Sequence, residues 1–159
     1  MTHFGGAPYC LTGGAIDPPR ATAERGGVST YLWIAAGGAL GSVARYGCSS
    51  LIAGWFGETF PLGTLIINVL GSFVIGLFAG LTGPDGRLMV SGDIRQFVMV
   101  GICGGYTTFS SFSYQTLTLA QDGQYARAGV NVVASVVLCL LAVWLGFVGA
   151  AAVNAVRGS

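Results

Sequence analysis

The sequence predicts an all-α integral membrane protein with four transmembrane helices, and three observations support this prediction. Of the 159 residues, 53% are hydrophobic and only 8% are charged, about a third of the ~25% charge content of soluble domains. Four apolar runs follow a more polar beginning, at residues 31–54, 61–81, 96–120 and 128–153. Each run exceeds the roughly 20 residues that a helix needs to cross a ~30 Å hydrocarbon core.

The first 30 residues differ in composition from the rest of the chain. Scattered glycines, charges and a Pro-Pro pair interrupt this stretch, which lacks the positively charged start and continuous apolar core of a cleaved signal peptide. We therefore expect residues 1–30 to form a disordered N-terminal extension. Residues 31–154 are expected to form one four-helix transmembrane unit, whose first helix directs insertion.

Cysteine spacing and net charge exclude several classes of function. The four cysteines show neither metal-type pairs nor the pattern of a secreted disulfide framework. Three of them lie in apolar runs, where cysteine behaves as a small hydrophobic residue. A formal net charge of +1, without any lysine, gives no basic patch, so we expect no nucleic-acid partner.

The first predicted span contains Arg45, the only charged residue in the four runs. It lies about nine residues from the end of its span, roughly 13 Å at 1.5 Å per residue. Burying it there costs on the order of 2–3 kcal/mol unless its side chain reaches water or the interface. Arg45 is either such an interfacial anchor or a cation that attracts anions. The carboxylates that a proton-coupled or cation carrier would need all fall outside the spans, at Asp17, Glu24, Glu58, Asp85, Asp93 and Asp122.

The second predicted span, "PLGTLIINVLGSFVIGLFAGL", places Asn68 near its middle. An unsatisfied amide is costly in hydrocarbon. Asn68 is therefore either a hydrogen-bonding contact between helices or a donor in a pore, and both alternatives stay open. Gly76 and Gly80 form a small-xxx-small pair that permits close helix approach.

The third predicted span contains "GICGGYTTFSSFSYQ" at residues 101–115. The adjacent Gly104 and Gly105, followed by a β-branched pair, disfavour a helix, so we expect a break near the middle of this span. Lipid cannot satisfy the backbone groups freed by a break. Such breaks build ion sites, in which carbonyl groups hold a cation and N–H groups an anion.

The residues after the glycines favour an anion path beside the break. Phe109 and Phe112 are three residues apart and share a helix face, and Ser110 and Ser113 share the neighbouring one. Aromatic rings have a positive edge, so ring edges beside hydroxyls form a lining that suits an anion. The alternative is a kinked helix whose hydroxyls bond to its own backbone.

The fourth predicted span carries Asn131, Ser135 and Cys139 at positions i, i+4 and i+8. They form one polar stripe on an apolar helix. The stripe either lines a polar track or packs against another helix, and the sequence does not separate the two.

Together these residues resemble the Fluc (CrcB) family of small fluoride channels. The resemblance extends from about residue 31 to residue 149 and is carried by "GGALGSVARY", "PLGTLIINVLGSF", "GICGGYTTFSSFS" and "NVVAS". The middle two motifs are specific. The resemblance implies a channel rather than an enzyme, in the inner (plasma) membrane, through which cytoplasmic fluoride leaves passively. It also implies an antiparallel dimer of four-helix subunits with two pores and a structural sodium ion on the two-fold axis.

The resemblance also implies roles for individual residues. Sodium would be held by the backbone carbonyls of Gly104 and Thr107 from both subunits. The chain departs from the family at Gln115, where a glutamate is common, which leaves the role of that acid in doubt here. The anion pore would comprise the pore amide of Asn68, the ring edges of Phe109 and Phe112, the hydroxyls of Ser110, Ser113 and Ser135, and Arg45 at the vestibule.

Two other classes compete with this interpretation. A four-helix dimeric multidrug exporter would need a carboxylate in its first helix, where this chain has only Arg45. A non-transporting membrane scaffold would use the polar residues only as contacts between helices.

The arginines outside the spans bear on how the subunit pairs. Four spans put both termini on one side, which then holds five arginines against one on the other side. Arginine-rich ends stay in the cytoplasm. An antiparallel homodimer needs one chain that inserts both ways, so this asymmetry favours a heterodimer with an oppositely biased paralogue. The five are Arg20, Arg25, Arg87, Arg95 and Arg157, and the one is Arg127.

Overall fold

The computed structural model describes residues 27–57, 60–84 and 86–156, and in these ranges it contains helices and no strand. Three long helices are α1 (Val28–Phe56), α2 (Leu62–Leu81) and α6 (Tyr125–Ala155). Between α2 and α6 the chain runs through a segmented helix. Its segments are α3 (Gly92–Gln96), the π-helix η1 (Phe97–Cys103), α4 (Gly104–Tyr106) and α5 (Phe109–Gln121). The all-α prediction is confirmed for the described residues.

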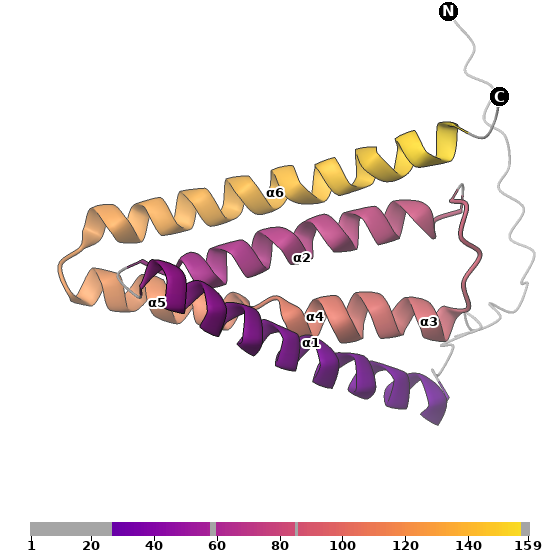
Figure 1. Cartoon of the computed structure of the whole chain (residues 1–159), viewed down its shortest axis with the longest axis horizontal. Helices are drawn as coiled ribbons and strands as arrows, with labels where there is room; N and C mark the ends of the chain where they lie inside the picture. Colours follow the sequence, from indigo (N-terminus) through magenta and orange to yellow (C-terminus); the bar gives the residue numbers. More distant parts are fainter. Residues whose placement is uncertain (1–26, 58–59, 85, 157–159) are drawn as a thin grey trace, which may run out of the picture.

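The helices run back and forth along one axis (Figure 1). α1 begins at the end of the bundle where α6 ends, and the turn between α5 and α6 lies at the opposite end. By length and composition, two of the described helices, α2 and α6, are apolar enough to cross a membrane. The predicted spans in α1 and in the segmented helix stay predictions.

Close helix contacts depend on glycines that leave no room for a side chain. A Cβ on Gly76 would collide with the carbonyl oxygen of Val143 in α6, and one on Gly80 would lie 2.6 Å from the Cβ of Ala150. The predicted small-xxx-small pair therefore brings α2 against α6.

A second glycine contact joins α1 to the segmented helix. A Cβ on Gly37 or Gly41 of α1 would collide with the backbone of η1, at the carbonyl oxygens of Phe97 and Ile102 respectively. From the other side, a Cβ on Gly105 would lie 2.6 Å from the carbonyl oxygen of Gly38. Removing side chains lets the backbones touch, which is how helices pack closely without a large apolar residue between them.

The predicted break near the middle of the third span is confirmed, and it lies at the β-branched Thr107 and Thr108 rather than at the two glycines before them. Both glycines are helical, within α4. Thr107 (φ −82°, ψ 159°) and Thr108 (φ −153°, ψ 112°) are extended. A glycine costs a helix only about 1 kcal/mol. Gly105 can pack against Gly38 only because it has no side chain, and this packing offsets the cost.

Helix boundaries differ modestly from the predicted spans. α1 begins at Val28, so the last three residues of the predicted disordered extension are helical, and residues 1–26 lie outside the described residues. α6 extends beyond the predicted 128–153 at both ends, starting at Tyr125. The third helical element starts at Gly92, where the side chain of Ser91 accepts a hydrogen bond from the N–H of Ile94 and caps the helix.

Candidate functional site at the helix break

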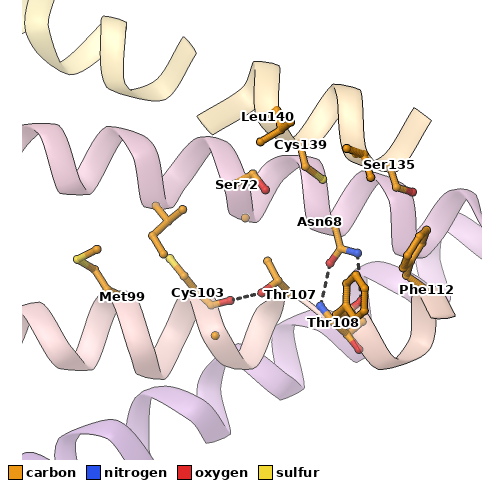
Figure 2. A pocket seen from close by; sticks show the side chains of 15 residues that line it. Asn68, Ser72, Met99, Cys103, Thr107, Thr108, Phe112, Ser135, Cys139 and Leu140 are labelled. Carbon is orange, nitrogen blue, oxygen red and sulfur yellow. Dashed lines mark hydrogen bonds between the residues drawn. The ribbon is translucent and has the colours of Figure 1, made fainter. Parts of the chain in front are cut away.

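A cavity of about 450 Å³, here called the central cavity, lies beside the helix break. Figure 2 shows its walls: α2 with Asn68 and Ser72, the segmented helix with Thr107 and Thr108, and α6 with Ser135. Six residues predicted for the site line it together: Asn68, Gly104, Thr107, Phe109, Phe112 and Ser135.

The amide of Asn68 binds the backbone at the break through two hydrogen bonds. Its Oδ1 accepts from the N–H of Thr108 at 2.8 Å, and its Nδ2 donates to the carbonyl oxygen of Thr108 at 3.1 Å (Figure 2). An extended residue between two helices has no intrahelical partner for either group, and leaving them unpaired is costly. Asn68 is therefore a hydrogen-bonding contact between two helices that also lines the cavity, and its role as a donor in a pore stays a prediction.

The first turn of α5 is capped by Thr108. Its Oγ1 accepts a hydrogen bond from the N–H of Ser111 at 3.2 Å and donates to the hydroxyl of Ser111 at 3.1 Å. The sequence pattern for such a cap is a threonine directly before a helical run. We did not predict that Thr108 lines the cavity or that Ser111 lies beside Arg45. The capping pattern would have pointed to Thr108.

These two sets of hydrogen bonds leave two backbone carbonyls without their helical donors. In an uninterrupted helix, the carbonyl of Gly104 would accept from the N–H of Thr108, and the carbonyl of Thr107 from that of Ser111. Both N–H groups bind elsewhere, to Asn68 and to the hydroxyl of Thr108. Gly104 and Thr107 both line the central cavity. They are the carbonyls that the resemblance assigns to sodium.

The two phenylalanines lie together at the start of α5, with ring centroids 5.3 Å apart and planes tilted by 49°. Their exposure differs sharply, because Phe112 is 9% exposed and Phe109 is 78% exposed. The predicted shared face is confirmed. Within one subunit only the ring of Phe112 is packed, and Phe109 projects from the surface.

The predicted hydroxyls of Ser110 and Ser113 lie apart from the cavity. Both residues are exposed, and neither lines any of the three described cavities. The hydroxyl of Ser113 donates to the carbonyl oxygen of Phe109 at 2.9 Å, which is the backbone bonding that the alternative interpretation expected. The hydroxyl of Ser110 lies 3.1 Å from that of Thr108.

The polar stripe of α6 divides between the two alternatives. Asn131 is 2% exposed, and its Nδ2 donates to the hydroxyl of Thr116 in α5 at 2.8 Å. Ser135 and Cys139 line the central cavity. Asn131 therefore packs one helix against another, whereas the two residues that follow it in the stripe belong to the cavity wall.

Arg45 lies in a second cavity of about 280 Å³, here called the arginine cavity. Its walls include Thr108, Ser111 and Gln115. Thr108 also lines the central cavity, so the two cavities meet at the helix break. The partly buried guanidinium of Arg45 thus shares a small polar space with the hydroxyl-rich start of α5, rather than with the phenylalanine rings.

A third cavity of about 520 Å³, here called the outer cavity, extends to the turn between α5 and α6. It shares Ser49, Thr64 and Gln115 with the arginine cavity and reaches Arg127. The Oε1 atom of Gln115 is buried and has no hydrogen-bond partner. Outer, arginine and central cavities therefore adjoin in that order, with Gln115 and Thr108 in the shared walls.

Comparison with known proteins identifies the family. Residues 32–147 match the family described as CrcB-like protein, Camphor Resistance (CrcB). The chain belongs to the CrcB family. The "Fluoride-specific ion channel FluC" of Rhodospirillum rubrum is 68% identical over 125 residues, which cover 79% of this chain and 97% of the relative. The protein of the same name from Opitutus terrae is 60% identical over 132 residues, 83% of this chain and all of the relative.

A third CrcB relative, the "Fluoride-specific ion channel FluC" of Methylocella silvestris, is 55% identical over 129 residues, 81% of this chain and 98% of the relative. These relatives are named as ion channels rather than as enzymes. Membership of the CrcB family makes the chain a membrane protein.

Proposed function

We propose that this protein is a fluoride-specific ion channel that lets cytoplasmic fluoride leave passively and so lowers its toxicity. The single observation that carries the proposal is the 68% identity, over nearly the whole of the relative, to a fluoride-specific channel. The central cavity contains the chemistry that such a channel needs, because it joins an amide, hydroxyls and a phenylalanine ring at a helix break.

Fluoride is small and strongly hydrated, so a pore must replace its water with hydrogen-bond donors. Ser135 and the N-terminal end of α5 line this region, and helix N-termini favour anions. Thr107 lines it as well, with its hydroxyl donating to the carbonyl oxygen of Cys103. No acidic residue lines the central cavity or the arginine cavity in the described part of the chain. Both cavities therefore avoid the carboxylate repulsion that would exclude an anion.

The adjoining cavities support a route for the anion. We propose that fluoride passes the ring edges of Phe109 and Phe112 in the central cavity, crosses the helix break toward Arg45, and leaves by the outer cavity. Hydrogen fluoride enters the cell uncharged and ionises in the cytoplasm, so a passive anion channel in the inner (plasma) membrane suffices for export.

A dimer is part of the proposal, and Gly104 supports it. This residue is exposed, and a Cβ added to it would meet nothing closer than the carbonyl oxygen of Met99 at 3.9 Å. Packing within the subunit therefore does not require glycine there. A second, antiparallel subunit approaching the central cavity would require it, and would also cover the exposed ring of Phe109.

We propose that a structural sodium ion lies at this contact, held by the carbonyls of Gly104 and Thr107 from both subunits. Support comes from the break, where the N–H groups that would bind these two carbonyls in a continuous helix bind other acceptors instead. Within the described residues there is no cluster of three His, Cys, Asp or Glu side chains that could hold a metal. Backbone carbonyls are therefore the groups suited to a hard cation.

The experiment that tests the function is fluoride efflux from proteoliposomes, measured with a fluoride electrode. We expect rapid efflux when the membrane potential is clamped with a potassium ionophore, and far slower efflux of chloride at the same concentration. A scaffold would give no efflux, and an exporter of organic cations would move its substrate and not fluoride.

The subunit is proposed to insert mainly with both termini in the cytoplasm and to pair with an oppositely biased paralogue. Arg87 and Arg95 are fixed at the end of the bundle where α1 begins and α6 ends. They donate to the carbonyl oxygens of Asn154 (3.1 Å) and Thr82 (3.3 Å), at the C-terminal ends of α6 and α2. Arg127 lies at the other end. Arginine near the spans keeps its end cytoplasmic.

Reporters fused to the C-terminus test this orientation. We expect a cytoplasmic reporter to be active and an external one to be silent. Charge reversal by Arg87→Glu and Arg95→Glu should raise the external signal, whereas Arg45→Gln, a charge change inside a span, should not. Equal signals from both reporters, with active channels formed by the chain alone, would establish a homodimer of dual orientation instead.

A further inference from the structure

We propose that Asn131 is a positioning residue for Phe112, which it reaches through the hydroxyl of Thr116. In this inference the Asn131–Thr116 pair sets where the ring of Phe112 stands in the anion path, and so how well the channel distinguishes fluoride from larger halides. The inference rests on the proposed function and deepens it.

Three residues form a continuous chain of hydrogen bonds from α6 into α5. The Nδ2 of Asn131 donates to the hydroxyl oxygen of Thr116 at 2.8 Å. The same hydroxyl donates to the carbonyl oxygen of Phe112 at 2.7 Å. Since a hydroxyl that accepts one strong hydrogen bond donates more strongly in return, the two bonds reinforce one another.

The position of α5 depends on such contacts because the helix is not continuous with α4. Its beginning is held by the two hydrogen bonds between Asn68 and Thr108. Two turns further along, Thr116 provides the link to α6. Phe112 lies between these two anchors, one turn before Thr116, and its ring is 9% exposed in the wall of the central cavity. A shift of α5 against α6 would therefore move this ring.

The geometry argues against direct contact between Asn131 and the anion. Asn131 is 2% exposed and lines none of the three described cavities. Ser135 and Cys139, one and two turns along the same stripe, do line the central cavity. The amide of Asn131 is thus sealed behind α5, and one of its N–H donors binds the hydroxyl of Thr116.

The test compares four single variants and one double variant, Asn131→Leu with Thr116→Val, in proteoliposomes, reading fluoride efflux and the ratio of fluoride to chloride permeability. Asn131→Leu removes the amide, Thr116→Val removes the hydroxyl at nearly constant shape, and Thr116→Ser restores it. Thr82→Val is the matched control, since the Thr82 hydroxyl makes the same kind of bond, to the carbonyl oxygen of Phe78 at 2.7 Å, away from the cavities.

We expect Asn131→Leu and Thr116→Val to lower the permeability ratio alike, by about three- to tenfold, as for the loss of one hydrogen bond. The double variant should be no worse than either single variant, because both break the same link. Thr116→Ser and Thr82→Val should keep the wild-type ratio.

A second measurement separates failure of the inference from failure of the proposed function. A 4-fluorophenylalanine at position 112 reports its surroundings by ¹⁹F NMR, whether or not the protein conducts. We expect Asn131→Leu and Thr116→Val to shift this resonance in the same way. A shared shift in a protein without fluoride efflux would remove the proposed function and keep the positioning.

Two results would overturn the inference. A wild-type ratio and resonance in Thr116→Val, beside a defective Asn131→Leu, would mean that Asn131 acts on the anion directly. Lowered thermal stability in both variants, with selectivity and resonance unchanged, would mean that the pair serves the fold alone.

Discussion

Replacing Asn68 tests whether its amide holds the helix break. Asn68→Ala removes both hydrogen bonds to Thr108, of 2.8 Å and 3.1 Å, and the extended backbone has no helical partner to replace them. An unpaired buried polar group costs about 1–3 kcal/mol. Because the central and arginine cavities both border Thr108 and admit water, we expect the lower figure for each group, or about 2 kcal/mol in total.

Asn68→Asp separates the structural role of the side chain from its role toward the anion. The carboxylate can still accept from the N–H of Thr108, so its effect on stability should be smaller than that of alanine. It also puts a negative charge in the wall of the anion route. Two like charges 4 Å apart repel by roughly 4 kcal/mol at an effective dielectric of 20, enough to slow transport about 10³-fold.

Fluoride efflux and thermal unfolding in detergent, measured on the same preparations, check both expectations. Asn154→Ala is the matched control, because the Nδ2 of Asn154 also donates to a backbone carbonyl, that of Gly80 at 3.2 Å, far from the cavities. It should lower stability and leave efflux per folded channel unchanged. If Asn68→Ala kept the wild-type efflux and unfolding temperature, Asn68 would not hold the helix break. Normal efflux in Asn68→Asp would remove Asn68 from the anion route.

Two further predictions concern the rings and the cation. Phe112→Ala and Phe109→Ala should each reduce fluoride efflux, but only Phe112→Ala should destabilise an isolated subunit, because its ring is 9% exposed and that of Phe109 is 78% exposed; equal unfolding temperatures would contradict this. Long dialysis into sodium-free lithium buffer should abolish efflux, and sodium should restore it. Thr107→Ala should be milder than Gly104→Val, and full activity without sodium would count against the site.

Much of the candidate site could be predicted from the sequence because rare polar residues in apolar spans have few places to go. Asn68, Thr107 and Ser135 come from α2, the segmented helix and α6 and still line one cavity. A polar side chain in a bilayer must face protein, water or a ligand. An amide such as that of Asn68 is therefore predicted to face inward before any contact is known, whereas a serine hydroxyl can bond to its own helix instead, as that of Ser113 does.

A break near the middle of the third span could be predicted, but its exact residues could not, because local propensity and tertiary packing oppose each other there. Propensity favours a break at Gly104 and Gly105. Packing keeps Gly105 helical against Gly38, while Asn68 fixes the extended backbone at Thr108. Which of these prevails depends on how closely α1 and α2 approach, and no local pattern contains that information.

The direction in which the serines point depends on the same feature, the exact position of the break. Ser110 and Ser113 follow the break directly, so the point at which α5 begins sets the face on which each lies. With α5 beginning at Phe109, the ring of Phe112 turns inward and the two serines turn outward. Spacing within a helix predicts which residues share a face, but the orientation of that face comes from the neighbouring helices.

The break joins two ends of opposite polarity within two residues. At the end of α4, Gly104 and Thr107 have carbonyls whose helical donors are diverted, which is the negative end of a helix. At the start of α5 the N–H groups of the first turn form a positive end. The diversion itself is made by neutral groups, the amide of Asn68 and the hydroxyl of Thr108. A cation site and an anion path can therefore lie side by side in an apolar bundle that provides Arg45 as its one charged side chain among the residues lining the central and arginine cavities.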